Sequence, residues 1–351
     1  MAYEKHTWEC GELITADKLN NIEDGIADGG SQLKNVKDDP SGNGGVIEGL
    51  VESEDHTPNQ ATGNYAHAEG SSTVATGGVA HAEGNATTAS GPMSHAEGNG
   101  STASGPISHA EGSGTQATGV QSHAEGYQTT ASGVMSHAEG YDTEASGDYS
   151  HAEGNSTKAT GNKSHAEGGN TEASGAMSHA EGEYTEASGN RSHAEGYLTT
   201  ASADYSHTEG NNTTASQISS HAEGSYTTAS EYACHAEGYQ TTASGFESHA
   251  EGYNTEARGY RSHAEGDSTK AIGNRSHAEG YFTTARSQDQ HVSGKFNVED
   301  TEGKYAVIIG NGTDENNRSN AFAMKWDGTF VFADGTEITP DQFASILASL
   351  E

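Results

Sequence analysis

Residues 122–135 read Ser-His-Ala-Glu-Gly-Tyr-Gln-Thr-Thr-Ala-Ser-Gly-Val-Met, and variants of this unit recur along most of the chain. Histidine falls at every fourteenth position from His67 to His291. The second residue after each of these histidines is glutamate from Glu69 to Glu279. A period that persists for more than 200 residues without an insertion indicates a solenoid in which each repeat forms one coil.

The first half of the unit predicts a strand, because its residue types alternate. Ser94, Ala96 and Gly98 share one phase, and His95 and Glu97 share the other. Successive side chains of a strand point to opposite faces. We therefore expect the small residues to face a narrow interior and the His and Glu to face outward.

The second half of the unit predicts a second, shorter strand. Thr129, Ala131 and Gly133 share a phase that faces the interior, and Thr130 and Ser132 oppose it. Turns of two variable residues close the coil, and Gly suits these corners because it adopts positive φ at little cost. Successive coils then stack as parallel strands about 4.8 Å apart.

Composition excludes several classes of protein. The 351 residues carry a net charge of −35, and 16 Lys and Arg face 51 Asp and Glu, so nucleic acid is not an expected partner. No apolar run approaches the roughly 20 residues of a membrane helix, so we expect no membrane insertion. The N-terminus lacks the apolar segment of a secretory leader, so we expect assembly in a cytoplasm. Cys234 stands where most repeats have Ser, which predicts a small buried thiol.

The coil is too thin to be stable alone, because Ala and Thr bury little apolar area. Association of several chains would compensate, and the repeated His and Glu offer a surface for it. We call these residues the His–Glu ladder and treat them as candidate interface residues. The ladder residues that we single out are His67, Glu69, His95, Glu97, His123, Glu125, His151, Glu153, His179, Glu181, His207, Glu209, His235, Glu237, His263 and Glu265.

A buried row of carboxylates requires partners. One hypothesis is that hydrogen-bonded His–Glu belts form between chains, with some His protonated and their pKa raised. An alternative is that the ladder faces solvent and has no role. A third is Zn²⁺ or Ni²⁺ held by symmetry-related His, which repulsion between ions about 4.8 Å apart disfavours. We expect no metal and no cofactor.

The repeats do not predict catalysis, since adjacent Ser and His point to opposite faces and an active site needs one cleft. Exposed tyrosines at the first turn are candidate glycan contacts. The alternative is that their rings stack from coil to coil and stiffen the solenoid. Ice binding by the Thr rows is a further option, which the inward direction of the regular Thr disfavours. The candidate glycan contacts are Tyr127, Tyr141, Tyr197, Tyr239, Tyr253 and Tyr281.

The repeat resembles the head repeat of trimeric autotransporter adhesins. Ser122, Ala124 and Gly126, followed by Ala131 and Gly133, fit that family's pattern, and the resemblance covers about residues 61–290. It implies an all-β fold, a trimeric left-handed parallel β-roll (a β-solenoid) of 14-residue repeats, with the ladder at the trimer axis. The ladder positions are usually apolar in the family but are His and Glu here.

The two ends resemble phage proteins. Residues 8–26, Trp-Glu-Cys-Gly-Glu-Leu-Ile-Thr-Ala-Asp-Lys-Leu-Asn-Asn-Ile-Glu-Asp-Gly-Ile, are similar to the N-terminus of tail and baseplate proteins from phages of Gram-positive bacteria. Residues 290–300, Gln-His-Val-Ser-Gly-Lys-Phe-Asn-Val-Glu-Asp, are similar to the domain that follows such repeats in phage fibre proteins. The resemblance implies a place in the virion and contact with other tail or baseplate proteins through the N-terminal segment.

Four regions are expected along the chain. Residues 1–30 are an attachment segment with a short helix capped by Thr15, and residues 31–60 are a linker rich in Gly and Asp. Residues 61–290 form the roll. Residues 291–351 form a trimerisation domain with a buried strand at 305–309, a hairpin around Asp327-Gly328 and a helix that begins with the capping box Thr-Pro-Asp-Gln at 339–342.

These features together predict a structural and adhesive fibre subunit and not an enzyme. It would be a rigid trimeric shaft of a phage or phage-derived tail that positions or provides host-receptor binding. The alternative is a carbohydrate-active tailspike, a polysaccharide depolymerase. That alternative requires a carboxylate pair in a groove, and the repeats contain no irregular insertion to build one.

Overall fold

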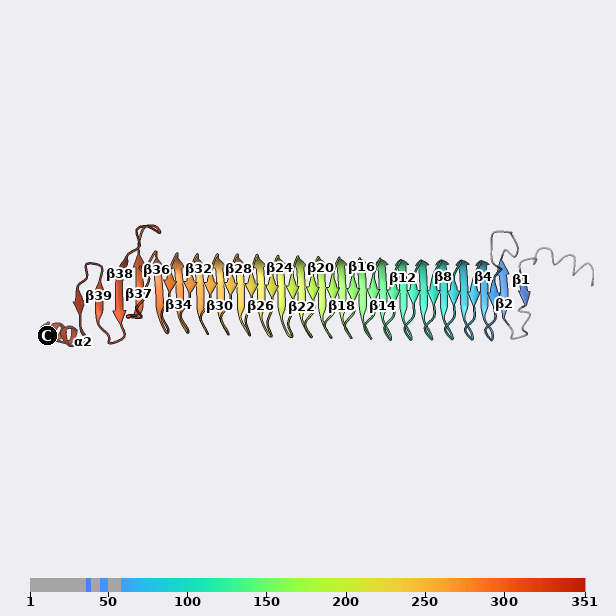
Figure 1. The fold of residues 1–351 in the computed structure, drawn as a ribbon, viewed down its shortest axis with the longest axis horizontal. Helices are drawn as coiled ribbons and strands as arrows, with labels where there is room; N and C mark the ends of the chain where they lie inside the picture. Colours follow the sequence, from blue (N-terminus) through green and yellow to red (C-terminus); the bar gives the residue numbers. More distant parts are fainter. Residues whose placement is uncertain (1–35, 39–44, 50–57, 351) are drawn as a thin grey trace, which may run out of the picture. The chain divides into compact units, whose positions relative to one another are not determined.

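The computed structural model describes residues 36–38, 45–49 and 58–350. The described chain is all-β apart from one short helix near its C-terminal end, and it forms a β-solenoid of 14-residue coils (Figure 1). The coils fall into two compact units, one that ends at Gly140 and one that begins at Tyr141. The expected N-terminal attachment segment and its helix, residues 1–30, lie outside the described residues.

Each coil contains one strand of five residues that starts at the repeat histidine. The long strands pair in parallel and in register, so that His109 pairs with His123 and Glu111 with Glu125. Every side chain therefore lies over its equivalent in the next coil. The long strands are β4 (His67–Ser71), β6 (His81–Asn85), β8 (His95–Asn99), β10 (His109–Ser113), β12 (His123–Tyr127), β14 (His137–Tyr141), β16 (His151–Asn155), β18 (His165–Gly169), β20 (His179–Glu183), β22 (His193–Tyr197), β24 (His207–Asn211), β26 (His221–Ser225), β28 (His235–Tyr239), β30 (His249–Tyr253), β32 (His263–Asp267), β34 (His277–Tyr281) and β36 (His291–Lys295).

The second strand of each coil has two residues and ends at the repeat alanine. These strands also pair in parallel, with Ala117 opposite Ala131. The short strands are β3 (Gln60–Ala61), β5 (Val74–Ala75), β7 (Thr88–Ala89), β9 (Thr102–Ala103), β11 (Gln116–Ala117), β13 (Thr130–Ala131), β15 (Glu144–Ala145), β17 (Lys158–Ala159), β19 (Glu172–Ala173), β21 (Glu186–Ala187), β23 (Thr200–Ala201), β25 (Thr214–Ala215), β27 (Thr228–Ala229), β29 (Thr242–Ala243), β31 (Glu256–Ala257), β33 (Lys270–Ala271) and β35 (Thr284–Ala285).

The interior consists of the small residues that the alternation predicted. Ala124, Thr129 and Ala131 have no exposed surface, and Ser122 is 2% exposed. The regular Thr therefore points inward and forms no flat outward array of the kind that ice binding requires. Cys234 is likewise buried and free, and its Sγ lies 3.3 Å from the carbonyl oxygen of Ala243. Burial raises the pKa of this thiol, as expected of a structural cysteine.

The alternation predicted that the glycine after each repeat glutamate lies in the interior. The structure shows that it does not. Gly98 is exposed and has a φ of +97°, because the strand bends into the first turn there and the alternation ends. The role of this glycine is close backbone approach. A Cβ placed on Gly98 would lie 2.1 Å from the carbonyl oxygen of Gly112 in the next coil.

The segment expected to be a linker, residues 31–60, contributes two strands. β1 (Val36–Asp38) pairs in antiparallel fashion with β2 (Val46–Gly49), and β2 pairs in parallel with β4, placing Val46 opposite His67. Ile47 is buried, as the interior position of this strand requires. The sheet of long strands thus begins before residue 61.

At the other end, β37 (Tyr305–Asn311) continues the sheet in parallel with β36. β38 (Asn320–Lys325), β39 (Phe330–Phe332) and β40 (Glu337–Ile338) then follow as an antiparallel meander. The predicted hairpin is β38–β39, and α2 (Pro340–Ala348) has the predicted capping box. No residue of α2 is buried.

The strand predicted to be buried at 305–309 is buried only in part. Ile308 is inside the last coil, whereas Ile309 is 41% exposed, because alternation continues along β37. Buried polar groups close this end of the solenoid. The Gln290 amide donates to the carbonyl oxygen of Tyr305 at 3.0 Å, and the Asp300 carboxylate accepts from the backbone N–H of Tyr305 at 2.8 Å.

Two glycines of one coil allow the close-approach argument to be tested. We expect Gly98→Ala to lower the free energy of unfolding by about 1–3 kcal/mol or more, since the new methyl meets a backbone carbonyl and φ is strained. Gly100→Ala is the matched control: φ is +68°, nothing lies within 4 Å of the added Cβ, and Ala86 has φ of 55° at the equivalent position. Thermal melts of both variants measure the difference. Equal losses of stability would contradict the argument.

Candidate functional site

The histidines of the ladder form stacks along the outer face of the long strands. In the first unit, His95 and His109 lie with ring centroids 4.7 Å apart and planes 3° apart, and His109 and His123 lie 4.8 Å apart at 3°. In the second unit, His221 and His235 lie 4.5 Å apart at 4°. The spacing agrees with the expected coil repeat of about 4.8 Å.

The structure brings the predicted His and Glu together on one face. Nε2 of His123 lies 3.7 Å from a carboxylate oxygen of Glu125 in its own coil and 3.8 Å from one of Glu111 in the preceding coil. In the second unit, Nε2 of His277 lies 3.4 Å from Glu265. About a third of each of these side chains is exposed, at 30–34%. The ladder is thus a half-buried surface of the single chain.

Eight described histidines have a lowered pKa in the single chain, whereas raised values were expected between chains. Burial, followed by the repulsion of the stacked His221 and His249, lowers the pKa of His235 to about 4. Glu237 raises it, but to a smaller extent. The hypothesis of raised pKa values concerned belts between chains, whereas in the single chain burial, and after it the neighbouring histidines, disfavour the charged imidazole. The other described histidines with a lowered pKa are His81, His109, His123, His165, His193, His207 and His263.

Glutamates of neighbouring coils also interact, and Glu97, Glu111 and Glu125 form a hydrogen-bonded row. Hydrogen bonds with Glu125 and Glu97, together with burial, raise the pKa of Glu111 to about 7. The same hydrogen bonds lower the pKa of Glu97 and of Glu125. Neighbouring carboxyls about one coil apart thus titrate as a row in which some members keep a proton that others lose.

The ladder contains sets of donor atoms that a metal ion would use, such as His67, Glu69 and His81, whose ligand atoms lie within 4.8 Å of one another. The stacking is unfavourable for chelation, however. Zn²⁺ holds nitrogen at about 2.0–2.1 Å, so two imidazoles on one ion cannot have nitrogens more than about 4.2 Å apart. Parallel rings about 4.7 Å apart, such as His95 and His109, would have to leave their stack to bind one ion.

An open groove of about 590 Å³ follows the ladder in the second unit. Its walls are carboxylates of successive coils and its floor is glycine backbone, with Glu237, Glu251, Glu265 and Glu279 in line. Glycosidases use two carboxyls in contrasting environments, whereas these glutamates repeat one environment. The depolymerase alternative therefore gains no support from this groove and stays a prediction.

The tyrosines predicted as glycan contacts are all exposed at the first turn, which is the turn that follows each long strand. Their exposed fractions range from 40% to 51%. Sequence reasoning missed Tyr184 and Tyr226, which occupy the second residue of the same turn. It also missed the aromatic side chains of the second turn, which precedes each long strand and exposes residues such as Tyr205 and Tyr260. The fourteen-residue period alone would have found these positions.

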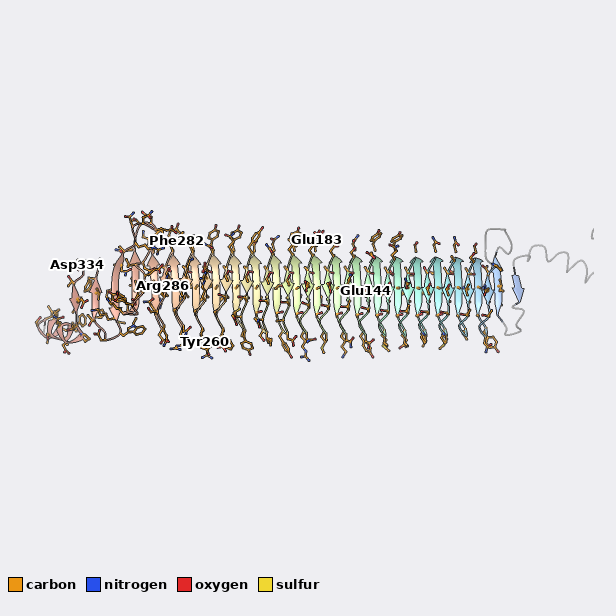
Figure 2. All side chains as sticks on the ribbon, viewed as in Figure 1. Glu144, Glu183, Tyr260, Phe282, Arg286 and Asp334 are labelled. Atoms are coloured by element: carbon orange, nitrogen blue, oxygen red, sulfur yellow. The ribbon has the colours of Figure 1, made fainter. Side chains whose placement is uncertain are left out.

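The second turn carries a stack of its own in the second unit. The ring of Phe246 lies 4.9 Å from that of Tyr232 and 5.4 Å from that of Tyr260. Figure 2 shows the two turns as opposite edges, with Glu183 and Phe282 on the first-turn edge and Tyr260 on the second-turn edge.

Comparison with known proteins supports the interpretation of the repeat. Residues 82–106 match two copies of the YadA head domain repeat. This repeat is a motif of trimeric autotransporter adhesins, so the chain is similar to them over that stretch. The adhesin-like repeats and the β-solenoid indicate a fibrous adhesive protein. No curated protein matches the chain. Within the described residues, no helix is both long and apolar enough to cross a membrane.

The histidine pKa values predict loss of stability in acid. An unfolded His titrates near pH 6.5, and a lower pKa in the folded chain means that the unfolded chain binds protons first. This contribution is fully present above about pH 6.5 and is lost as the pH falls toward about 4, the pKa of His235. Glu97 and Glu125, whose pKa is also lowered, act in the same direction at lower pH, whereas Glu83 and Glu111 oppose it.

We therefore expect the melting temperature to fall by several degrees between pH 7.5 and pH 5, and the imidazole of His235 to stay neutral at pH 5.5 by NMR. His235→Gln should reduce the pH dependence. A melting temperature that rises on acidification would contradict this account and favour protonated His–Glu belts.

Proposed function

We propose that the protein is a homotrimeric fibre subunit of a phage or phage-derived tail, a rigid shaft that positions or provides host-receptor binding. The observation that carries the proposal is the adhesin-type repeat at residues 82–106, together with coils that stack in register without insertions within each unit. The resemblance of residues 8–26 and 290–300 to phage tail proteins supports the proposal that the fibre belongs to a phage or phage-derived tail. It also supports attachment to other tail or baseplate proteins through the N-terminal segment.

Trimer formation is supported by the weakness of the single coil. The interior of each coil contains Ala, Thr and Ser, and these side chains bury little apolar surface. The ladder is the face that would gain most from a neighbour, because its imidazoles are half-buried and stacked already. Neutral imidazole donates through one nitrogen and accepts through the other, so ladders of adjacent chains would complete each other's hydrogen bonds without burying unpaired charge.

The C-terminal region is proposed to hold three chains in register. Nearly identical coils allow alternative pairings between chains, and a unique end removes that freedom. Helix α2 has nine residues, fewer than the roughly 12–15 that make an isolated helix marginally stable. Its apolar stripe, Phe343, Ile346, Leu347 and Leu350, is nevertheless exposed in the single chain. Equivalent stripes of two other chains would cover it.

The proposal predicts the mass of the assembly. Light scattering after gel filtration should give three times the chain mass of 36.3 kDa. The double substitution Ile346→Asp and Leu347→Asp should shift the mass toward that of a monomer or broaden the distribution, because charge would enter the apolar seam. Ser345→Asp, on the opposite face of α2, is the control and should keep three chains. A monomeric wild-type protein would refute the proposal.

A further inference from the structure

The first-turn edge of the second unit contains a stretch with an unusual composition. Five successive coils place ten residues there, and none of them is charged, although the chain has a net charge of −35. They are Tyr, Asn or Gln apart from Leu198 and Ser225, and all except the half-buried Ser225 are exposed. We call this stretch the aromatic–amide edge. Its residues are Tyr197, Leu198, Asn211, Asn212, Ser225, Tyr226, Tyr239, Gln240, Tyr253 and Asn254.

The opposite edge of the same unit shows that the fold does not require this composition. The second turn adopts the same left-handed conformation, with φ of 53° at both Glu247 and Arg261. The second turn accepts charged side chains beside exposed rings such as Tyr232 and Phe246. Some of these charges pair between coils, and Arg261 contacts Glu247 at 2.5 Å. Two edges with one backbone geometry therefore differ in charge: the first-turn edge is uncharged over these five coils, whereas the second-turn edge mixes charged side chains with aromatic rings.

The first turn of the other unit provides a second comparison. Its left-handed positions are occupied by Ser72, Ala86, Gly100 and Gly114, and the coils there stack equally well. A mechanical need for aromatic rings would apply to these coils too. Ring stacking as a stiffening device thus does not explain why exposed rings at this turn gather in the later coils.

The rings of the aromatic–amide edge are arranged around amides. Tyr226 and Tyr239 meet edge to face, with centroids 6.0 Å apart and planes at 71°, and Tyr239 stacks on Tyr253 at 5.3 Å. The coil between Tyr197 and Tyr226 has no ring at this turn and presents Asn211 and Asn212 instead. Two exposed amides are thus flanked by an aromatic ring in the coil on each side.

We propose that the aromatic–amide edge binds a neutral polysaccharide. A pyranose ring has an apolar face of C–H groups, which packs on the electron-rich face of Tyr, and a rim of hydroxyls, which pair with amides that both donate and accept. A regular step of about 4.8 Å between coils suits a polymer of repeated units. This inference rests on the proposed host-binding role of the fibre and names the class of ligand.

Charge selects the class of polysaccharide. The edge has no Lys or Arg to pair with sulfate, phosphate or uronate groups, and the net charge of −35 repels polyanions. It has no Asp or Glu to attract a cationic polymer. Binding should therefore depend little on salt, because contacts between uncharged groups are not screened.

The test compares two triple variants in which Tyr is replaced by Ser, a residue that occurs naturally at equivalent turn positions. Tyr197→Ser, Tyr226→Ser and Tyr239→Ser alter the edge, where Ser225 and Ser268 are native at the equivalent turn positions. Tyr65→Ser, Tyr149→Ser and Tyr205→Ser alter the second turn as a matched control, where Ser219 is native with φ of 58°. Both proteins are full-length and are checked by thermal melts and by light scattering.

Binding is measured by affinity electrophoresis and microscale thermophoresis on dextran, mannan and galactomannan, with dextran sulfate as the charged counterpart of dextran. We expect the wild type to bind at least one neutral polymer and not dextran sulfate. The edge variant should bind at least about tenfold more weakly, and the control variant should bind as the wild type does.

Failure to bind any neutral polymer, stronger binding of dextran sulfate, or an equal loss in both variants would overturn the inference. Light scattering separates this outcome from failure of the proposed fibre. If the protein is a trimer but does not bind polysaccharide, the fibre proposal stands and the ligand inference is wrong. If it binds polysaccharide but is a monomer, the ligand inference stands and the trimer proposal is wrong.

Discussion

Parallel, in-register stacking of the backbone is the constraint on which the rest of the structure depends. The long strands pair residue by residue with their equivalents, so the repeat His, Ala, Glu and Gly each have the same residue type in the neighbouring coils. Glycine makes this possible at the bend, where the backbone of Gly98 approaches that of Gly112 too closely for a side chain. Only small residues fit the interior, and this leaves each coil with little apolar area to bury.

Like-on-like stacking decides the chemistry of the ladder. Burial and the neighbouring His221 and His249 disfavour the charged form of His235. Hydrogen bonds with Glu97 and Glu125 raise the pKa of Glu111 while they lower the pKa of both partners. Glu111 is therefore partly protonated near neutral pH, beside histidines such as His109 and His123 whose lowered pKa keeps them neutral. A row of neutral imidazoles beside partly protonated carboxyls is compatible with burial against another chain, which a fully ionised row would not be.

Much of the fold could be predicted from the alternation of side chains along each strand and from the 14-residue period. The burial of Ala124 and Thr129, the outward His and Glu, the hairpin at Asp327-Gly328 and the capping box at Thr339 were all predictable. The prediction that Gly98 faces the interior was wrong, because side chains alternate between faces only while the strand stays extended.

The candidate site was predictable in position but less so in chemistry. The ladder lies where the alternation placed it, yet the pKa direction depends on which neighbour is nearest, and stacking made that neighbour another histidine. The tyrosines of the first turn were found as single residues. The sequence did not indicate that these tyrosines belong to one uncharged edge. That conclusion depends on comparing the two turns, which share one backbone conformation but differ in charge.

The two-residue turns have a consequence for the gene. Because each coil closes on itself with the same number of residues and joins its neighbours through the same backbone contacts, one coil is geometrically interchangeable with another. Recombination between repeats in multiples of 42 base pairs, the coding length of 14 residues, would lengthen or shorten the protein in whole steps and keep the reading frame. Unequal crossing-over thus offers such a lineage a way to vary its reach while each edge changes its side chains independently.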